Sequence, residues 1–188
     1  MERQILHVDV NSAFLSWSAA DMLKNGSKEE IRNIAAVIGG DEKTRTGIVL
    51  AKSEKAKECG VQTGESLYMA RKKSRALKVY PTNFKVYEYY SNKLYKLLLE
   101  YTDKIERFSI DECFLDITEY LMGRTPLDIA NEISKRVRDT LGFTVNIGVA
   151  HNKLLAKMAS DFTKPNRVHT LYKEEIERKM CHFLSLNS

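Results

Sequence analysis

Apolar residues follow two kinds of spacing along this chain, one typical of strands and the other of helices. Short apolar runs bounded by polar residues predict strands at 4–10, 34–40, 46–51, 77–81, 104–110, 113–119, 143–150 and 167–172. Apolar residues three and four positions apart predict helices at 11–26, 52–60, 65–76, 83–103, 125–142, 152–162 and 173–184. The helix at 125–142 has the clearest limits, because Thr125 can cap it, Pro126 suits its first turn and Gly142 ends it.

The order of the predicted elements indicates an α+β fold with one insertion. A strand and a helix come first, a basic segment at about 25–80 follows, and helix, strand, strand, helix, strand and helix complete the chain. Without the basic segment this order matches a ferredoxin-like core, in which helices cover one face of an antiparallel sheet. Asn11 and Asn152 stand where the N-caps of two of these helices are expected.

Composition narrows the class of protein. The 188 residues are 43% hydrophobic, but they contain no apolar run of about 18 residues, so we expect no membrane partner. Asp9 interrupts the apolar stretch at the N-terminus, which therefore lacks the pattern of a secretory signal. Cys59, Cys113 and Cys181 form no CxxC pair, which argues against a disulfide framework or a zinc site and favours a cytoplasmic location. The histidines share no metal-ligand spacing, and His7 is expected to pack within its apolar strand.

Positive charge is concentrated in one part of the chain. Residues 43–78 hold ten Lys and Arg against three Glu, a net charge of +7, whereas the whole chain carries +5 at pH 7. Such asymmetry favours a basic surface that binds a polyanion such as nucleic acid. Solvated helix faces would give the same composition, so charge alone leaves both interpretations open.

Three carboxylates are predicted to meet at one edge of the sheet. Asp9 lies near the end of the first strand, and Asp111 and Glu112 lie between the strands at 104–110 and 113–119. If the first strand lies beside that hairpin, the three side chains converge and need a counter-charge. Oxygen-only ligands suit Mg²⁺ or Mn²⁺, and two such ions about 4 Å apart would serve phosphoryl transfer. A solvated turn with an acidic pair is the alternative interpretation.

A line of basic side chains is the predicted partner of these carboxylates. Lys153, Lys157 and Ser160 share one face of the penultimate predicted helix, and Lys164 continues the line. Pro165 keeps Lys164 extended, where its ammonium group could reach a phosphate. An ordinary exposed helix face is the alternative interpretation.

Several stretches of the chain resemble motifs of the Y-family DNA polymerases, the translesion group that includes DNA polymerase IV and UmuC-like proteins. HVDVNSAF (7–14) is similar to the family's first metal motif, and SIDECFLDIT (109–118) is similar to its acidic-pair motif. GVAHNKLLAKMASDFTKPN (148–166) resembles its late palm helix with the trailing Lys-Pro-Asn. KAKECGVQTGES (55–66) is similar to the fingers stretch near the incoming triphosphate. The matches follow the family's order over nearly the whole chain.

The resemblance implies roles for the carboxylates. Asp9, Asp111 and Glu112 would be the catalytic residues, and together with the carbonyl group of Val10 they would hold two Mg²⁺ ions, which Mn²⁺ can replace. The implied reaction is template-directed transfer of a nucleotide from a dNTP to the 3′-OH of a primer, as in translesion DNA synthesis.

The resemblance also implies how the nucleotide is bound. Phe14 falls where the family has an aromatic steric gate, whose ring would clash with a ribose 2′-OH. Ser12 and Ala13 would line the phosphate path through their backbone N–H groups, near a helix N-terminus suited to anions. Lys164 would bind the triphosphate.

Some positions depart from the family pattern, among them Asn11, Ser12 and Arg167. Where the family usually has Tyr and, three residues later, Arg, this chain has Glu54 and Lys57. Lys57 can still meet a phosphate, but only as a point charge, and Ser53 is a possible substitute for the missing hydroxyl. Lys153 and Lys157 are further predicted phosphate or DNA contacts.

The resemblance divides the chain into two functional parts. Residues 1–24 and 80–188 correspond to the palm and residues 25–79 to the fingers, whereas the thumb and the DNA-gripping domain would lie outside this chain. Primer-template DNA and a dNTP are the implied partners. The replication sliding clamp is an implied partner of the regions outside the chain.

Three other functions share parts of this pattern. An aspartyl-phosphate phosphatase needs a second Asp two residues after the first, where this chain has Asn11, and an amide cannot act as a general acid. A nucleotidyl cyclase shares the ferredoxin-like core and the two-metal site, but the fingers-like insertion gives no reason to expect one. A catalytically weak or inactive relative that binds DNA or nucleotide fits the departure at Glu54, while the three carboxylates argue against it.

Overall fold

The computed structural model describes residues 2–40 and 47–179, which fall into two compact units. The first unit comprises Met1–Asn11 and Ser91–Ser188, and the second comprises Ser12–Tyr90. Helix α4 (Phe84–Leu98) crosses the boundary between them. The assignment of palm and fingers to parts of the chain remains a prediction.

The first unit is built on a five-stranded sheet with the order β5-β6-β1-β7-β8. Its strands are β1 (Ile5–Val10), β5 (Ile105–Arg107), β6 (Glu112–Asp116), β7 (Val145–Ala150) and β8 (Val168–Thr170). Strands β5, β6, β1 and β7 pair antiparallel, as predicted, whereas β8 pairs parallel with β7. The α+β class is confirmed, and the sheet is mixed rather than wholly antiparallel.

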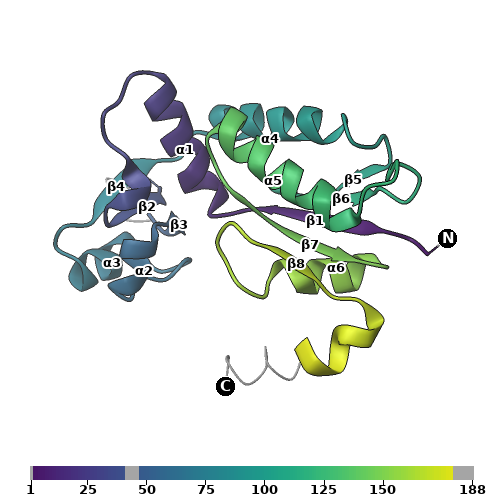
Figure 1. Cartoon of the computed structure of the whole chain (residues 1–188). Coiled ribbons are helices and arrows are strands. Elements are labelled where there is room, and N and C mark those ends of the chain that lie inside the picture. The colour runs from purple at the N-terminus through teal and green to yellow at the C-terminus, as the bar shows by residue number, and fades with distance from the viewer. Residues whose placement is uncertain (1, 41–46, 180–188) are drawn as a thin grey trace. The chain divides into compact units, whose positions relative to one another are not determined.

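Helices lie on both faces of this sheet (Figure 1). Helix α5 (Pro126–Leu141) and the C-terminal part of α4 lie over one face, and α6 (Lys153–Ser160) lies over the other, which differs from the prediction of one covered face. Side chains alternate along a strand, and Ile5 of β1 packs against Ala156 of α6, so His7 and Asp9 share the α6 face. This placement decides which side chains can reach Asp9.

The second unit contains a smaller sheet with helices packed against it. The strand order is β3 (Val49–Lys52), β2 (Ala36–Gly39) and β4 (Lys78–Pro81), with β2 antiparallel to β3 and parallel to β4. The helices are α1 (Ala13–Lys24), α2 (Glu54–Glu58) and α3 (Leu67–Lys73), besides a 3-10 helix at Ile31–Asn33. One cluster of its buried apolar side chains comprises Val37, Val49, Ala56, Val61, Leu67, Ala70 and Leu77.

Local signals set the limits of α5 correctly. The Thr125 side chain accepts from the N–H of Asp128, and the Asp128 carboxylate accepts from the N–H of Thr125, a reciprocal capping box. Gly142 ends the helix with φ 77°, a left-handed conformation that glycine adopts without strain. The cap of α6 is confirmed as well, because the Asn152 side chain accepts from the N–H of Leu155.

Other helix limits differ from the prediction. Helix α4 ends at Leu98 instead of 103, and α6 ends at Ser160 instead of 162. The prediction that Asn11 caps α1 is wrong, since Ser12 holds the N-cap position with φ 46° and no side-chain cap bond. The Asn11 side chain instead donates to the side chain of Asn146 in β7.

Two predicted segments extend outside the described residues. The connection between the strands predicted at 34–40 and 46–51, a turn expected at 41–46, lies wholly outside them. The helix predicted at 173–184 lies partly outside, and Lys173–Glu175 form a 3-10 helix. No helix among residues 2–40 and 47–179 is both long and apolar enough to cross a membrane.

Candidate functional site

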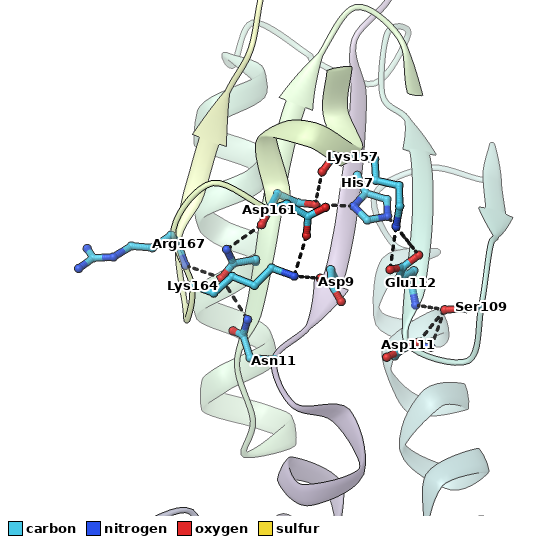
Figure 2. Close-up of polar contacts among 12 residues, drawn as sticks. His7, Asp9, Asn11, Ser109, Asp111, Glu112, Lys157, Asp161, Lys164 and Arg167 are labelled. Carbon is cyan, nitrogen blue, oxygen red and sulfur yellow. Dashed lines mark hydrogen bonds and ion pairs between the residues drawn. The ribbon is translucent and has the colours of Figure 1, made fainter. Parts of the chain in front are cut away.

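The predicted metal ligands lie at the adjoining ends of β1 and β6 (Figure 2). Asp9 and Glu112 are directly opposite each other in the antiparallel register. The backbone N–H of Val10 donates to the carbonyl oxygen of Asp111 at 3.1 Å. Asp9 is only 7% exposed, whereas Glu112 is half-buried. The strand pairing therefore brings Asp9, Val10, Asp111 and Glu112 to one end of the sheet.

Two lysines contact the carboxylates from the α6 side. The Lys164 ammonium group contacts the Asp9 carboxylate and lies 2.9 Å from that of Asp161. The Lys157 ammonium group lies 2.8 Å from both carboxylate oxygens of Glu112. Because both lysines come from α6 and the loop after it, the predicted line of basic side chains does meet the carboxylates.

Asp111 has a different environment. The Ser109 hydroxyl donates to the Asp111 carboxylate at 2.6 Å and accepts from the backbone N–H groups of Asp111 and Glu112. Among residues 2–40 and 47–179, no three side chains of His, Cys, Asp or Glu are grouped so that they could hold a metal ion. In this structure lysine ammonium groups compensate the charges of Asp9 and Glu112, and the Ser109 hydroxyl binds Asp111.

The chemistry of the donor set nevertheless fits a divalent cation. Burial raises the pKa of Asp9; the hydrogen bond and charge of Lys164 oppose that shift, and the charges of Glu112 and Asp111 add to it. The ionised form of Asp9 is thus disfavoured by burial even with Lys164 in contact, and a bound cation would stabilise it. Its donors are oxygen atoms only, which suits Mg²⁺ or Mn²⁺.

His7 lies beneath α6, fully buried as predicted. Its Nδ1 lies 2.8 Å from the Ser160 hydroxyl, and its Nε2 lies 3.7 Å from Glu112 and has no hydrogen-bond partner in the described part of the chain. Burial and the Lys157 charge lower the pKa of His7 to about 4, against the opposing charges of Glu112 and Asp161. The imidazole is therefore neutral at pH 7.

We expect His7 to make the fold sensitive to mild acid. In the unfolded chain a histidine takes up a proton near pH 6.5, whereas His7 in the folded chain does so only near pH 4. Between pH 6.5 and 4 the unfolded state therefore binds more protons than the folded state. The free energy of unfolding should fall by about 3 kcal/mol as the pH drops from 6.5 toward 4. Denaturant unfolding at several pH values measures this loss.

The His7→Gln variant is the control for that measurement. Carboxylates elsewhere in the chain titrate in both proteins, so the difference between the two pH profiles isolates His7. The charges of Lys157 and Lys164 both favour the neutral imidazole of His7. Profiles of equal slope between pH 6.5 and 4 would contradict the buried, neutral state of His7.

Sequence reasoning missed two partners of the carboxylates and lysines. Asp161 follows Lys157 by four residues and precedes Lys164 by three, a spacing that on a helix and its last turn brings it near both. Ser109 lies two residues before Asp111, where a hydroxyl can accept from the backbone of a turn. Lys153, the first basic residue of the predicted line, contacts Glu106 at the surface instead of the three carboxylates.

The predicted nucleotide-binding residues of the second unit lie at the start of α1. Ser12 is exposed at the N-cap position, and Ala13 is buried behind it. The half-buried ring of Phe14 stacks on Tyr87 with their centroids 4.6 Å apart, and the edge of Phe84 faces Phe14 at 6.4 Å. Phe14 thus belongs to an aromatic cluster that fixes its ring.

The predicted phosphate contacts at the start of α2 have different surroundings. Lys57 is exposed, and its ammonium group lies 3.4 Å from Glu54. Ser53 is 2% exposed, and its hydroxyl donates to the carbonyl of Ile34 at 2.6 Å and accepts from the N–H of Ala56 at 3.1 Å. Ser53 therefore serves as the cap of α2, and the proposed site does not include it.

Comparisons with known proteins agree on one family. The sequence model of the impB/mucB/samB family matches residues 8–161. DNA polymerase IV of Clostridium acetobutylicum is 53% identical over 180 residues, which cover 96% of this chain and 46% of that protein. Among solved structures, DinB from Sulfolobus solfataricus is 28% identical with a TM-score of 0.81, over 93% of this chain and 50% of that one.

A ternary complex belongs to the same group of structures. The insertion ternary complex of Dbh DNA polymerase is 27% identical to this chain with a TM-score of 0.81, and the match covers 93% of this chain and 50% of that one. The chain thus spans about half the length of the relatives that it matches.

Proposed function

Because the chain belongs to the impB/mucB/samB family, the Y-family of DNA polymerases, we propose that it carries the catalytic residues of a translesion DNA polymerase. In the proposed reaction the 3′-OH of a primer attacks the α-phosphate of a dNTP, a phosphodiester bond forms, and pyrophosphate leaves. The observation that carries this proposal is the register of β1 and β6, which sets Asp9 opposite Glu112 beside Asp111.

Asp9, Asp111, Glu112 and the carbonyl group of Val10 are the proposed ligands of two Mg²⁺ ions, for which Mn²⁺ can substitute. When bound, such ions activate the attacking oxygen and stabilise the charge on the leaving one. The carboxylates then no longer need their lysine partners. The ammonium groups of Lys157 and Lys164 become available to phosphate oxygens, which prefer such charge-assisted contacts.

The remaining proposed roles concern the substrates. Primer-template DNA and a dNTP are the proposed partners, with Ser12 and Ala13 along the phosphate path and Lys57 and Lys153 at phosphates. We place this activity in the cytoplasm, and we assign contact with a sliding clamp to regions outside this chain. Much of the affinity for duplex DNA depends on the number of phosphate contacts, so this chain by itself should bind DNA weakly.

Primer extension tests the proposed function. The substrates are a primed template and dNTPs with Mg²⁺ or Mn²⁺, and the proteins are this chain and a chimera with the C-terminal half of the Clostridium acetobutylicum relative, of which this chain matches 46%. We expect template-dependent extension by the chimera. If the chimera does not extend the primer, or if it forms cyclic nucleotide from ATP without a template, the proposed polymerase function is wrong.

Phe14→Ala should relax sugar discrimination in the chimera. The aromatic cluster holds the Phe14 ring in place, and removing it takes away the surface that we expect to meet a ribose 2′-OH. Discrimination against ribonucleotides, measured as the ratio of kcat/KM for dNTP and rNTP, should fall by about a hundredfold. Phe84→Ala removes a ring that contacts Phe14 at an edge but leaves the stacked partner Tyr87 in place, so it should change the ratio much less. Equal ratios for Phe14→Ala and wild type would remove the gate assignment.

A further inference from the structure

Asn146 is a fully buried amide near the start of β7, and every polar position of its side chain is used. An asparagine side chain offers two N–H donors and can accept two hydrogen bonds. Its Nδ2 donates to the carbonyl oxygens of Ser160 at 2.9 Å and Thr163 at 2.8 Å. Its Oδ1 accepts from the backbone N–H of Arg167 at 3.2 Å and from Nδ2 of Asn11 at 3.1 Å. The backbone partners fix which end of the amide carries the oxygen.

Asn11 is the second member of this amide pair, and it is 8% exposed. Its Oδ1 accepts from the backbone N–H of Asn166 at 2.9 Å and from the Thr144 hydroxyl at 3.0 Å. This is the side chain that the sequence pattern assigned to a helix cap. The tertiary structure uses it instead to extend the reach of Asn146.

The amide pair binds the loop after α6 on both sides of Lys164. One bond reaches the carbonyl oxygen of Thr163, and two reach the N–H groups of Asn166 and Arg167. Lys164 itself faces the carboxylates, while the Arg167 side chain points away from them (Figure 2). The loop is therefore attached through its backbone, and Lys164 is the residue enclosed by the attachments.

We propose that Asn146, together with Asn11, is a positioning residue that holds the Lys164 ammonium group between Asp9 and Asp161. The consequence for a triphosphate rests on the proposed function, whereas the placement of Lys164 does not. An aspartate at position 146 would keep the shape of the side chain but offer no N–H to the carbonyls of Ser160 and Thr163. The attachment before Lys164 would then be lost, and the carboxylate would repel both carbonyl oxygens.

A double-mutant cycle on the unliganded chain tests the placement. The free energy of unfolding is measured for wild type, Asn146→Asp, Lys164→Met and the double variant. Lys164→Met removes the partner of the buried Asp9 and should destabilise the wild-type chain. In the Asn146→Asp background that loss should fall by at least half, because the ammonium group is no longer held in place. Losses that simply add would overturn the proposal.

Two further variants make this cycle decisive. Asn146→Ser keeps a small polar side chain and replaces Asn146→Asp if the latter does not fold. Asn131→Asp makes the same chemical change at an exposed position of α5. The effects of Asn131→Asp and Lys164→Met on the free energy of unfolding should simply add. A coupling between positions 131 and 164 as large as that between 146 and 164 would overturn the assignment to Asn146.

Binding of dATP with Mg²⁺ tests the consequence for the nucleotide. Lys164→Met and Asn146→Asp should each raise the dissociation constant about tenfold, and the double variant should bind no more weakly than Lys164→Met. Val137→Ala, a destabilising change in the buried face of α5, should leave it unchanged. Unaltered binding in Asn146→Asp, with weaker binding in Lys164→Met, would overturn the positioning role. If Lys164→Met itself binds normally, the proposed contact with triphosphate is wrong, while the unfolding cycle still decides the placement.

Discussion

Asp9→Asn should lower nucleotide incorporation by the chimera about a thousandfold or more. The variant keeps the shape of the side chain but loses the charge with which Asp9 is proposed to bind a metal ion. Charge stabilisation of a transition state by a metal ion is worth several kcal/mol, and about 4 kcal/mol corresponds to a factor of about a thousand. Single-turnover incorporation of one dNTP measures the effect, and Glu112→Gln should behave alike.

The same substitution should leave the fold intact. Burial raises the pKa of Asp9, which means that its ionised carboxylate is disfavoured in the folded chain. A neutral amide removes that cost, although Lys164 then loses one of its two carboxylate partners. The two changes oppose each other, so we expect the free energy of unfolding to stay within about 1 kcal/mol of wild type.

Asp116→Asn is the matched control. Asp116 lies on β6 opposite Ile5, at the other end of the strand pair from Asp9, and its carboxylate contacts Arg3 at the surface. The Asp116 carboxylate is half-buried and also accepts hydrogen bonds from Thr118, but none of these contacts involves a proposed metal ligand. Incorporation should therefore stay within about twofold of wild type. Wild-type incorporation by Asp9→Asn, or an equal loss in Asp116→Asn, would show that the carboxylates of β1 and β6 are not the metal ligands.

Gly148→Ala should destabilise the first unit by about 3 kcal/mol or more. A Cβ at this position of β7 would lie 1.8 Å from the carbonyl oxygen of Ala156 and 2.6 Å from the backbone nitrogen of Ser160. Both are backbone atoms of α6, so the new methyl group cannot be accommodated by a change of rotamer. Either α6 moves off the sheet or β7 bends, and Lys157 moves with the helix. Denaturant unfolding measures the loss.

Gly40→Ala is the control for that substitution. The nearest atom to a Cβ at Gly40 is the Cα of Gly47 at 3.4 Å, an ordinary contact distance. Its effect should be below about 1 kcal/mol, the range of a tolerated glycine replacement. If Gly148→Ala is no worse than Gly40→Ala, the close packing of α6 on β7 is not a determinant of stability.

The comparison of α5 with α4 shows why some elements were predictable. The limits of α5 are encoded locally, by Thr125 at its cap and Gly142 after its last turn, and the structure has both. Helix α4 has no such stop signal, and its apolar spacing continues to Tyr101. The helix nevertheless ends at Leu98, and the Tyr101 hydroxyl donates to Glu132 of α5. The contact between Tyr101 and Glu132 joins residues 31 positions apart, so it cannot be predicted from the residues around the end of α4.

The sequence by itself determined the strands and helices of the core, the acidic residues at two strand ends and the basic residues after Asn152, because periodicity, caps and strand ends are local properties. Only the tertiary structure decided which residues meet. Strand register set Asp9 opposite Glu112. Because α6 covers the face of β1 that carries Asp9, Lys157 and Lys164 reach the carboxylates. The absence of a side chain at Gly148 lets α6 approach β7 closely. Local sequence predicts Asn11 as a helix cap, because the residue that its side chain contacts, Asn146, is 135 residues away in the sequence.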